Sequence, residues 1–290
     1  MGFPRRREFG AADGDQAVSE AAAGTIPGAA SLRRETEDAV ALVILDRPAS
    51  RNSLSSAMLG ELIDAFAAIA SDRAVRAVVL AAEGPAFCSG HDLKELTARR
   101  ADPDGGRAFF DAVWAKCSTM MQAVVRLPQP VIACVQGAAT AAGCQLVAAC
   151  DLAVAAEGAT FATPGVNIGL FCSTPMVALS RNVGRKAAMR MLLTGDLITA
   201  AEALSFDLVS HVVPATQLAI HTATLAEKIA SKSRLTIAIG KEAFYRQVEL
   251  PLAEAYAYAS QVMTVNMAKQ DAREGIDAFL EKRPPVWSGD

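Results

Sequence analysis

The chain has 290 residues, long enough for one large domain or for a core domain with a smaller appendage. Hydrophobic residues make up 52% of it and charged residues 20%, which excludes a chain that is disordered throughout. The formal net charge of −3 argues against a nucleic-acid-binding protein with a domain-wide basic surface, but it allows a local cationic pocket for a phosphate.

The N-terminal segment, residues 1–35, is rich in Ala, Gly, Arg and short polar residues. It lacks an apolar h-region, which excludes a secretory signal, and its acidic residues argue against an organelle transit peptide. We therefore expect three parts: a disordered tail over 1–35, a core domain over 36–214 and a helical region over 215–290.

Strand and helix patterns alternate through the core. Apolar runs predict buried strands over 39–45, 75–82, 131–135 and 152–155. Apolar residues at helical spacing predict helices over about 55–70, 104–126 and 142–149. Such alternation with short connections is typical of an α/β fold whose helices cover the faces of a sheet.

One uncharged stretch, residues 127–150, is long enough for a membrane helix. Pro128, Pro130, Gly137 and Gly143 interrupt it. We therefore expect a buried strand, a turn and a buried helix there, and no membrane span.

The C-terminal part is predicted to be helical. Thr199 and Glu202 match a capping box, which predicts a helix start. Further helical patterns cover about 215–231, 234–247, 252–268 and 270–281. Apolar faces such as that of Tyr256 and Met263 exceed what a small appendage buries alone, so we expect this region to pack on the core or on a partner subunit.

The six cysteines form no CxxC pair and have no metal-like spacing with the three histidines. Their apolar surroundings predict reduced, packed thiols and no metal site. We expect a cytoplasmic protein, or one of the mitochondrial matrix if the source is eukaryotic.

Two turns that contain glycine follow predicted strands. One is Gly90-His91-Asp92, and the other, Ala141 to Cys144, opens the helix over 142–149. A helix N-terminus exposes unpaired N–H donors and a partial positive charge. Two such donors that converge on one carbonyl oxygen form an oxyanion hole, where each contributes about 2.7–4 kcal/mol in the transition state. The alternative is that small residues are needed there only for tight packing.

The motifs around these turns extend along the chain. They include LDRP at 45–48, GPAFCSGHDLK at 84–94, PVIA at 130–133 and LTG at 193–195. In this order and spacing, roughly over 36–285, the chain resembles the enoyl-CoA hydratase (crotonase) family. The strings SGHDLKEL at 89–96, ATAAGCQLVA at 139–148 and FATPGVN at 161–167 resemble its subgroup called enoyl-CoA hydratase domain-containing protein 3.

This resemblance implies a crotonase-like spiral of ββα units with a helical C-terminal trimerisation region, assembled as a homotrimer or a dimer of trimers. It implies an acyl-CoA ligand in lipid or fatty acid metabolism and no cofactor apart from the CoA of the substrate. The backbone N–H groups of the oxyanion hole fall on His91 and Ala142.

The resemblance also implies which residues contact the ligand. The adenine end lies along Arg51, Asn52 and Ser53, and Lys94 is a candidate for the CoA phosphates. The other positions implied to contact the substrate are Asp92, Leu93, Gly143 and Pro164.

The sequence departs from the family pattern at the two catalytic glutamates, which fall on Gln145 and Gly165. An amide does not take a proton near neutral pH, and glycine has no side chain. We therefore predict that ordinary enoyl-CoA hydration is weak or absent.

Several alternatives remain open at this point. His91 could replace the missing base, a cysteine such as Cys144 or Cys172 could act as a nucleophile, and Asp92 could simply cap the turn that follows it. The enzyme hypothesis covers hydration, isomerisation, decarboxylation and thioester hydrolysis. Against it stand a non-catalytic acyl-CoA carrier, sensor or regulatory subunit, and a purely structural oligomer.

Overall fold

The computed structural model describes residues 31–289. Residues 1–30 of the expected tail lie outside this described range. The expected tail boundary at residue 35 is wrong, because Leu32–Glu37 form strand β1, which pairs antiparallel with β2 (Val40–Leu45). The polar sequence of β1 gave no strand signal. Arg33 anchors it through ion pairs with Asp46, at 2.8 Å, and Glu83, which are tertiary contacts.

A six-stranded sheet forms the centre of the fold, in the order β1-β2-β3-β5-β7-β10. Its other strands are β3 (Ala77–Ala82), β5 (Val131–Val135), β7 (Leu152–Ala156) and β10 (His211–Val213). The adjacent pairs β2–β3, β3–β5, β5–β7 and β7–β10 are all parallel, so only the β1–β2 pair of this sheet is antiparallel. All residues of β2, β3 and β5 are buried, as expected for parallel strands covered on both faces.

A second, four-stranded sheet contains β4 (Ala86–Cys88), β6 (Ala138–Thr140), β8 (Thr160–Ala162) and β9 (Ile198–Thr199). In each of the consecutive pairs β3–β4, β5–β6 and β7–β8, the first strand belongs to the large sheet and the second to this smaller sheet, and a helical segment follows. This repeat is the spiral of ββα units that the family resemblance implies. Sequence periodicity missed these strands because two or three residues are too short to show a period.

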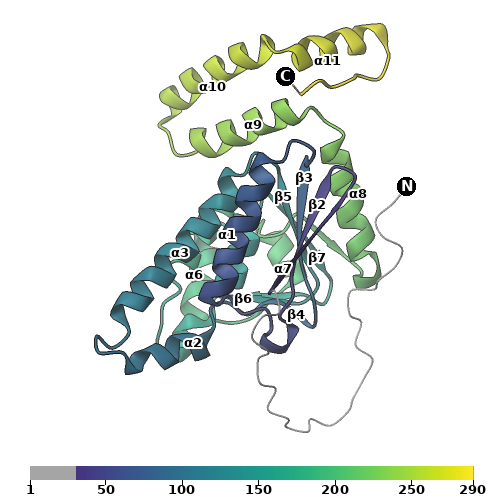
Figure 1. The fold of residues 1–290 in the computed structure, drawn as a ribbon. Coiled ribbons are helices and arrows are strands. Elements are labelled where there is room, and N and C mark those ends of the chain that lie inside the picture. The colour runs from purple at the N-terminus through teal and green to yellow at the C-terminus, as the bar shows by residue number, and fades with distance from the viewer. Residues whose placement is uncertain (1–30, 290) are drawn as a thin grey trace.

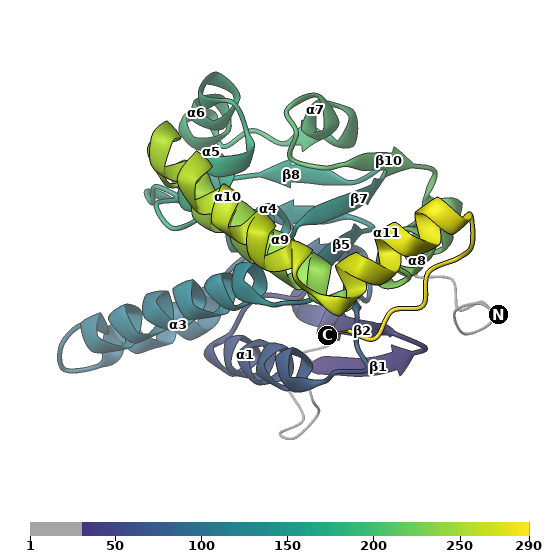
Figure 2. The same cartoon turned by 90° about the horizontal axis from the view of Figure 1, so that it is seen from above.

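Helices cover both faces of the large sheet (Figures 1 and 2). α1 (Ser56–Ser71) and α3 (Arg107–Arg126) pack side by side on one face, where α4 (Ala142–Ala149) also contributes to the core. α8 (Leu218–Ala230) packs on the other face against β2, β3, β5 and β7. The expected boundary at residue 214 therefore differs from the structure, because α8 belongs to the core and the helical extension begins at α9.

The short helices α2 (Leu93–Ala98), α5 (Pro175–Asn182), α6 (Arg185–Thr194) and α7 (Ala200–Ser205) complete the core. The predicted capping box is confirmed, since Thr199 and Glu202 exchange both hydrogen bonds at the start of α7. All six cysteines are free and buried, as predicted.

The extension contains α9 (Arg234–Gln247), α10 (Leu252–Met267) and α11 (Gln270–Glu281), which lie together at one end of the molecule (Figure 1). No residue of α9 is fully buried. A polar cluster joins α9 to the core, in which Lys241 Nζ lies 2.7 Å from Asp151 and Tyr245 donates a 3.0 Å hydrogen bond to the same carboxylate. Lys241 also donates to the Val124 and Gln129 carbonyl oxygens.

Candidate functional site

The two turns singled out in the sequence lie against each other. Gly90 follows β4 with φ +91°, and a Cβ atom there would lie 2.9 Å from Ala141 Cβ and 3.2 Å from Ala142 N. A Cβ atom at Gly143 would lie 2.1 Å from the Cys88 carbonyl oxygen. Glycine is therefore required at both positions for the end of β4 to meet the first turn of α4.

Two backbone donors at this junction are unused. Leu54 donates to the Gly90 carbonyl at 2.8 Å and accepts from Asp92 N–H at 3.2 Å, and this bridge leaves out the N–H of His91 between them. Among the hydrogen bonds of residues 31–289, none is donated by His91 N–H or Ala142 N–H. Ala142 is the first residue of α4, where the helix dipole favours negative charge.

The backbone just before α4 is strained. Ala141 has φ 51° and ψ −118°, a conformation that a residue with a side chain rarely adopts. Its N–H donates to the Ala162 carbonyl of β8 at 2.9 Å, which ties the turn to the second sheet. Strain held in place by its surroundings is typical of functional turns.

These turns open onto a large cleft with a volume of about 1380 Å³. Its walls come from residues 46–51, 53, 89, 91–95, 114, 141–142, 164–165, 167–168 and 170–175. Nine of the twelve site residues expected from the sequence line it: Arg51, Ser53, His91, Asp92, Leu93, Lys94, Ala142, Pro164 and Gly165. The other three, Asn52, Gly143 and Gln145, are not among its lining residues.

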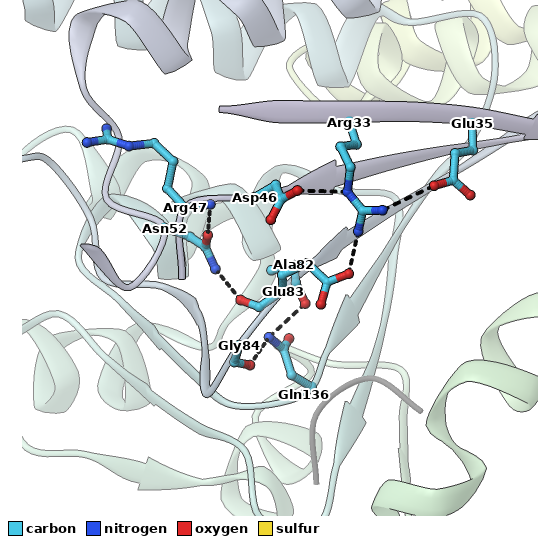
Figure 3. A network of polar contacts seen from close by, with 9 residues as sticks. All are labelled: Arg33, Glu35, Asp46, Arg47, Asn52, Ala82, Glu83, Gly84 and Gln136. Carbon is cyan, nitrogen blue, oxygen red and sulfur yellow. Dashed lines mark hydrogen bonds and ion pairs between the residues drawn. The ribbon is translucent and has the colours of Figure 1, made fainter. Parts of the chain in front are cut away.

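Asn52 lies behind the cleft wall, fully buried, and holds it together. Its Oδ1 accepts from Arg47 N–H at 2.8 Å, and its Nδ2 donates to the carbonyls of Glu83 and Ala86 at 2.8 and 2.9 Å. With φ 53° it adopts the left-handed conformation that asparagine tolerates better than most residues. Figure 3 shows these contacts between Asn52, Arg47 and Glu83.

Gln136 and Arg33 support the same wall, although no sequence motif indicated a role for either residue. Gln136 Nε2 lies within hydrogen-bond distance of the carbonyls of Ala82, Gly84 and Ala86, at 3.0, 3.0 and 3.2 Å. Arg33 joins Glu35, Asp46 and Glu83 from the neighbouring strand β1 (Figure 3). No local sequence signal could have revealed the links of Gln136 or the link from Arg33 to Glu83, because these partners lie 50 or more residues away along the chain.

The His91 side chain is not set up as a base. Its ring meets Trp114 edge-on with centroids 4.7 Å apart, and both ring nitrogens are buried without a hydrogen-bond partner among the described residues. Burial lowers the pKa of His91 to about 4, and the nearby Leu54 backbone offsets only part of that shift. The imidazole is therefore neutral near pH 7, and its nitrogens do not face the cleft solvent.

The carboxylates that line the cleft are all engaged by other groups. Asp46 pairs with Arg33, and Glu95 accepts from Ser56 N–H at 2.8 Å. Asp92 accepts from the N–H groups of Lys94 and Glu95 and so caps α2, as one of the open alternatives proposed. The wall formed by residues 141–175 contributes no carboxylate to the described lining.

Gln145 and Gly165 lie in confined surroundings. Gln145 is 5% exposed, and its Oε1 is buried without a hydrogen-bond partner in the described part of the chain. A Cβ atom at Gly165 would lie 2.7 Å from the Leu170 carbonyl oxygen and 2.9 Å from Cys172 Sγ. Leu170 N–H donates to the Gly165 carbonyl at 2.9 Å, so the segment 170–172 closes directly over position 165.

The two cysteines near the cleft are poor nucleophiles. Burial raises the pKa of Cys144 to about 12, and burial also raises the pKa of Cys172. Both are therefore protonated near pH 7, which argues against the nucleophile hypothesis.

Two further structural features bear on binding chemistry. Among residues 31–289, no group of three or more His, Cys, Asp or Glu side chains is placed to hold a metal ion. In the same part of the chain, no helix has both the length and the apolar character needed to cross a membrane.

Comparison with known proteins gives consistent matches. The family model described as enoyl-CoA hydratase/isomerase matches residues 35–290. The mouse protein named enoyl-CoA hydratase domain-containing protein 3, mitochondrial, is 49% identical over 252 residues, which cover 87% of this chain and 82% of the mouse protein.

Solved structures agree with the sequence matches. The crystal structure of an enoyl-CoA hydratase from Mycobacterium smegmatis superposes with a TM-score of 0.85 at 51% identity, covering 89% of this chain and 99% of the other. The human enoyl-CoA hydratase domain-containing protein 3 gives a TM-score of 0.85 at 48% identity, covering 89% and 100%. These matches confirm the predicted resemblance and the fold.

Proposed function

Because the chain belongs to the enoyl-CoA hydratase/isomerase family, we propose that it binds an acyl-CoA thioester in its cleft and polarises the thioester carbonyl with two backbone N–H groups. The observation that carries this proposal is the pair of unused donors, His91 N–H and Ala142 N–H, at two turns that pack against each other and line one cleft. An enolate or tetrahedral oxyanion placed there gains stabilisation from both donors and from the α4 dipole.

The CoA moiety fits the opposite, charged part of the cleft. Arg47, Arg51 and Lys94 line this part, and Ser50 and Ser53 add hydroxyl groups. Guanidinium and ammonium groups are the side chains that bind phosphates, so we assign the phosphates of CoA to this end. The site needs no other cofactor for this role.

We further propose that ordinary hydration is slow. Gln145 and Gly165 stand where the family resemblance implies glutamates. The three carboxylates that line the cleft are already engaged, since Asp46 pairs with Arg33, Asp92 caps α2 and Glu95 accepts a hydrogen bond from Ser56 N–H. General acid and general base catalysis each contribute roughly 10²–10⁴-fold. We therefore expect crotonyl-CoA turnover at least about 10²-fold below that of a hydratase that has both glutamates.

Other reactions remain compatible with an oxyanion hole that lacks these carboxylates. Isomerisation, decarboxylation and thioester hydrolysis all pass through an enolate or a tetrahedral oxyanion. The same lack of acid/base groups favours a second candidate: a protein of lipid metabolism that carries or senses acyl-CoA without converting it.

The proposed assembly is a trimer or a dimer of trimers through α9–α11. Phe279, Tyr256 and Leu280 on these helices are 81%, 70% and 70% exposed, and such apolar surface marks an interaction site. Sedimentation velocity would measure this assembly. We place the protein in a reducing aqueous compartment, the cytoplasm or the mitochondrial matrix, because its six buried cysteines are all free.

The proposal is tested by isothermal titration calorimetry of the protein with a panel of acyl-CoAs. The mass of the ligand recovered afterwards is then measured by mass spectrometry. A bound ligand of changed mass establishes an enzyme and its reaction, whereas a bound ligand of unchanged mass favours the carrier or sensor. If no acyl-CoA and no free CoA binds, the proposed function is wrong.

The oxyanion hole is tested by Ala142→Pro, which removes one donor at the first position of α4. If the protein is an enzyme, turnover falls by about 10²–10³-fold. A melting curve recorded on the same sample controls for folding. Unchanged turnover in a folded variant would exclude a role for this donor.

A further inference from the structure

The two halves of the cleft differ sharply in charge. All six charged side chains that line it come from residues 46–95: Asp46, Arg47, Arg51, Asp92, Lys94 and Glu95. The described lining that comes from residues 114–175 contains no charged side chain. The two unused N–H donors lie where these halves meet, because His91 belongs to the first and Ala142 to the second.

The uncharged half presents large apolar side chains to solvent. Ile168, Leu170 and Phe171 are 59%, 54% and 43% exposed, and all three line the cleft together with Trp114. Ile168, Leu170 and Phe171 follow one another at the end of η3 (Pro164–Ile168), and Trp114 of α3 lines the same cleft, so we treat these four residues as one apolar rim. An apolar ligand segment that covers this rim removes their surface from water, which is favourable.

We propose that this rim, Ile168, Leu170, Phe171 and Trp114, binds the distal part of an unsubstituted acyl chain and discriminates against chains that end in a carboxylate. The inference rests on the proposed acyl-CoA function. A thioester held between the two N–H donors directs its CoA toward the charged half and its acyl chain toward the rim. A terminal carboxylate would lose its hydration there and would meet no cation in the described lining.

A second copy of the chain is the competing occupant of the rim. If the copy covered Ile168 and Leu170, substitutions there would change the assembly and leave the acyl-chain preference unchanged. The continuity of the rim with the donors favours the acyl chain, because one cleft contains both.

The experiment measures dissociation constants by calorimetry for CoA, acetyl-CoA, and the hexanoyl, octanoyl, decanoyl and adipyl thioesters. Burial of each methylene group is worth up to about fourfold in affinity, so we expect affinity to rise along the saturated series. Adipyl-CoA has the same chain length as hexanoyl-CoA but ends in a carboxylate, and we expect it to bind at least about tenfold more weakly.

A charge substitution tests the same site in the opposite direction. Ile168→Lys places a cation on the rim and should narrow or reverse the preference for hexanoyl-CoA over adipyl-CoA. Ile220→Lys on α8 is the matched control, since Ile220 is 68% exposed and is not among the residues that line the cleft. The control should keep the wild-type preference, and melting curves show whether both variants fold.

The outcomes separate the two proposals. If CoA and acetyl-CoA bind but affinity is independent of chain length, or if adipyl-CoA binds as well as hexanoyl-CoA, the rim inference is wrong and the proposed function stands. If Ile168→Lys alters sedimentation and not the preference, the rim is an interface between copies. If none of these compounds binds, the proposed function itself fails.

Discussion

Gly165→Ala is the most direct test of how the cleft is closed. A methyl group at position 165 would lie 2.7 Å from the Leu170 carbonyl oxygen and 2.9 Å from Cys172 Sγ. Both distances are too short for a carbon atom, and one of the two obstacles is backbone. The segment 170–172 must therefore move before any side chain fits at position 165.

The expected cost follows from this overpacking. Inserting a methylene-sized group into a packed site costs about 1–3 kcal/mol, so Gly165→Ala should lower the free energy of unfolding by that amount. Gly240 provides a control of opposite sign, because it lies inside α9 and a Cβ atom there meets nothing within 4 Å. Gly240→Ala should raise stability by about 0.5–1 kcal/mol.

The assay is urea unfolding of the wild type and both variants at one protein concentration, with the free energy extrapolated linearly to zero denaturant. An unchanged or increased stability of Gly165→Ala would refute this reasoning, since the segment 170–172 would then move aside freely. In that case Gln145→Glu combined with Gly165→Glu should gain crotonyl-CoA hydration. With the closed segment, we expect the double variant to gain little and to unfold at lower urea.

Three further predictions concern buried polar groups. Lys241→Met leaves Asp151 buried without its cation, so urea unfolding should show a free energy of unfolding lower by about 3–5 kcal/mol. A decrease below about 0.5 kcal/mol is typical of a surface substitution, and it would mean that the ion pair does not hold α9 on the core. The pKa of His91 is about 4 in the folded protein against 6.5 for an unperturbed imidazole, so between these pH values the unfolded chain binds a proton that the folded chain does not. The wild type should therefore lose up to about 3 kcal/mol of stability as pH falls from 6.5 to 4, and melting curves of His91→Gln should lack this part of the loss. Asn52→Asp loses the two hydrogen bonds that the amide donates and buries a charge, so it should lower the free energy of unfolding by at least about 2 kcal/mol in urea unfolding. It should also weaken acyl-CoA binding measured by calorimetry. Unchanged binding would show that Asn52 does not position the cleft wall.

Local sequence patterns determined much of the core. The apolar runs of β2 and β5 predicted buried strands, and the Thr199–Glu202 capping box predicted the start of α7, because these signals lie within a few neighbouring residues. The glycine turns at Gly90 and Gly143 indicated close backbone approach, and the family motifs placed nine of twelve expected site residues on one cleft.

Only the tertiary structure decided which side chains line the cleft. Asn52 and Gly143 belong to family motifs, yet neither lines the cleft. Asn52 holds the cleft wall together from behind by hydrogen bonds, and Gly143 packs on β4. The contact between Arg33 and Glu83 joins residues 50 positions apart, which no local pattern encodes, and the polar strand β1 is identified only by its pairing with β2. The state of His91 likewise depends on Trp114 and on burial, because a side chain's pKa is set by its surroundings in space and not by its neighbours in sequence.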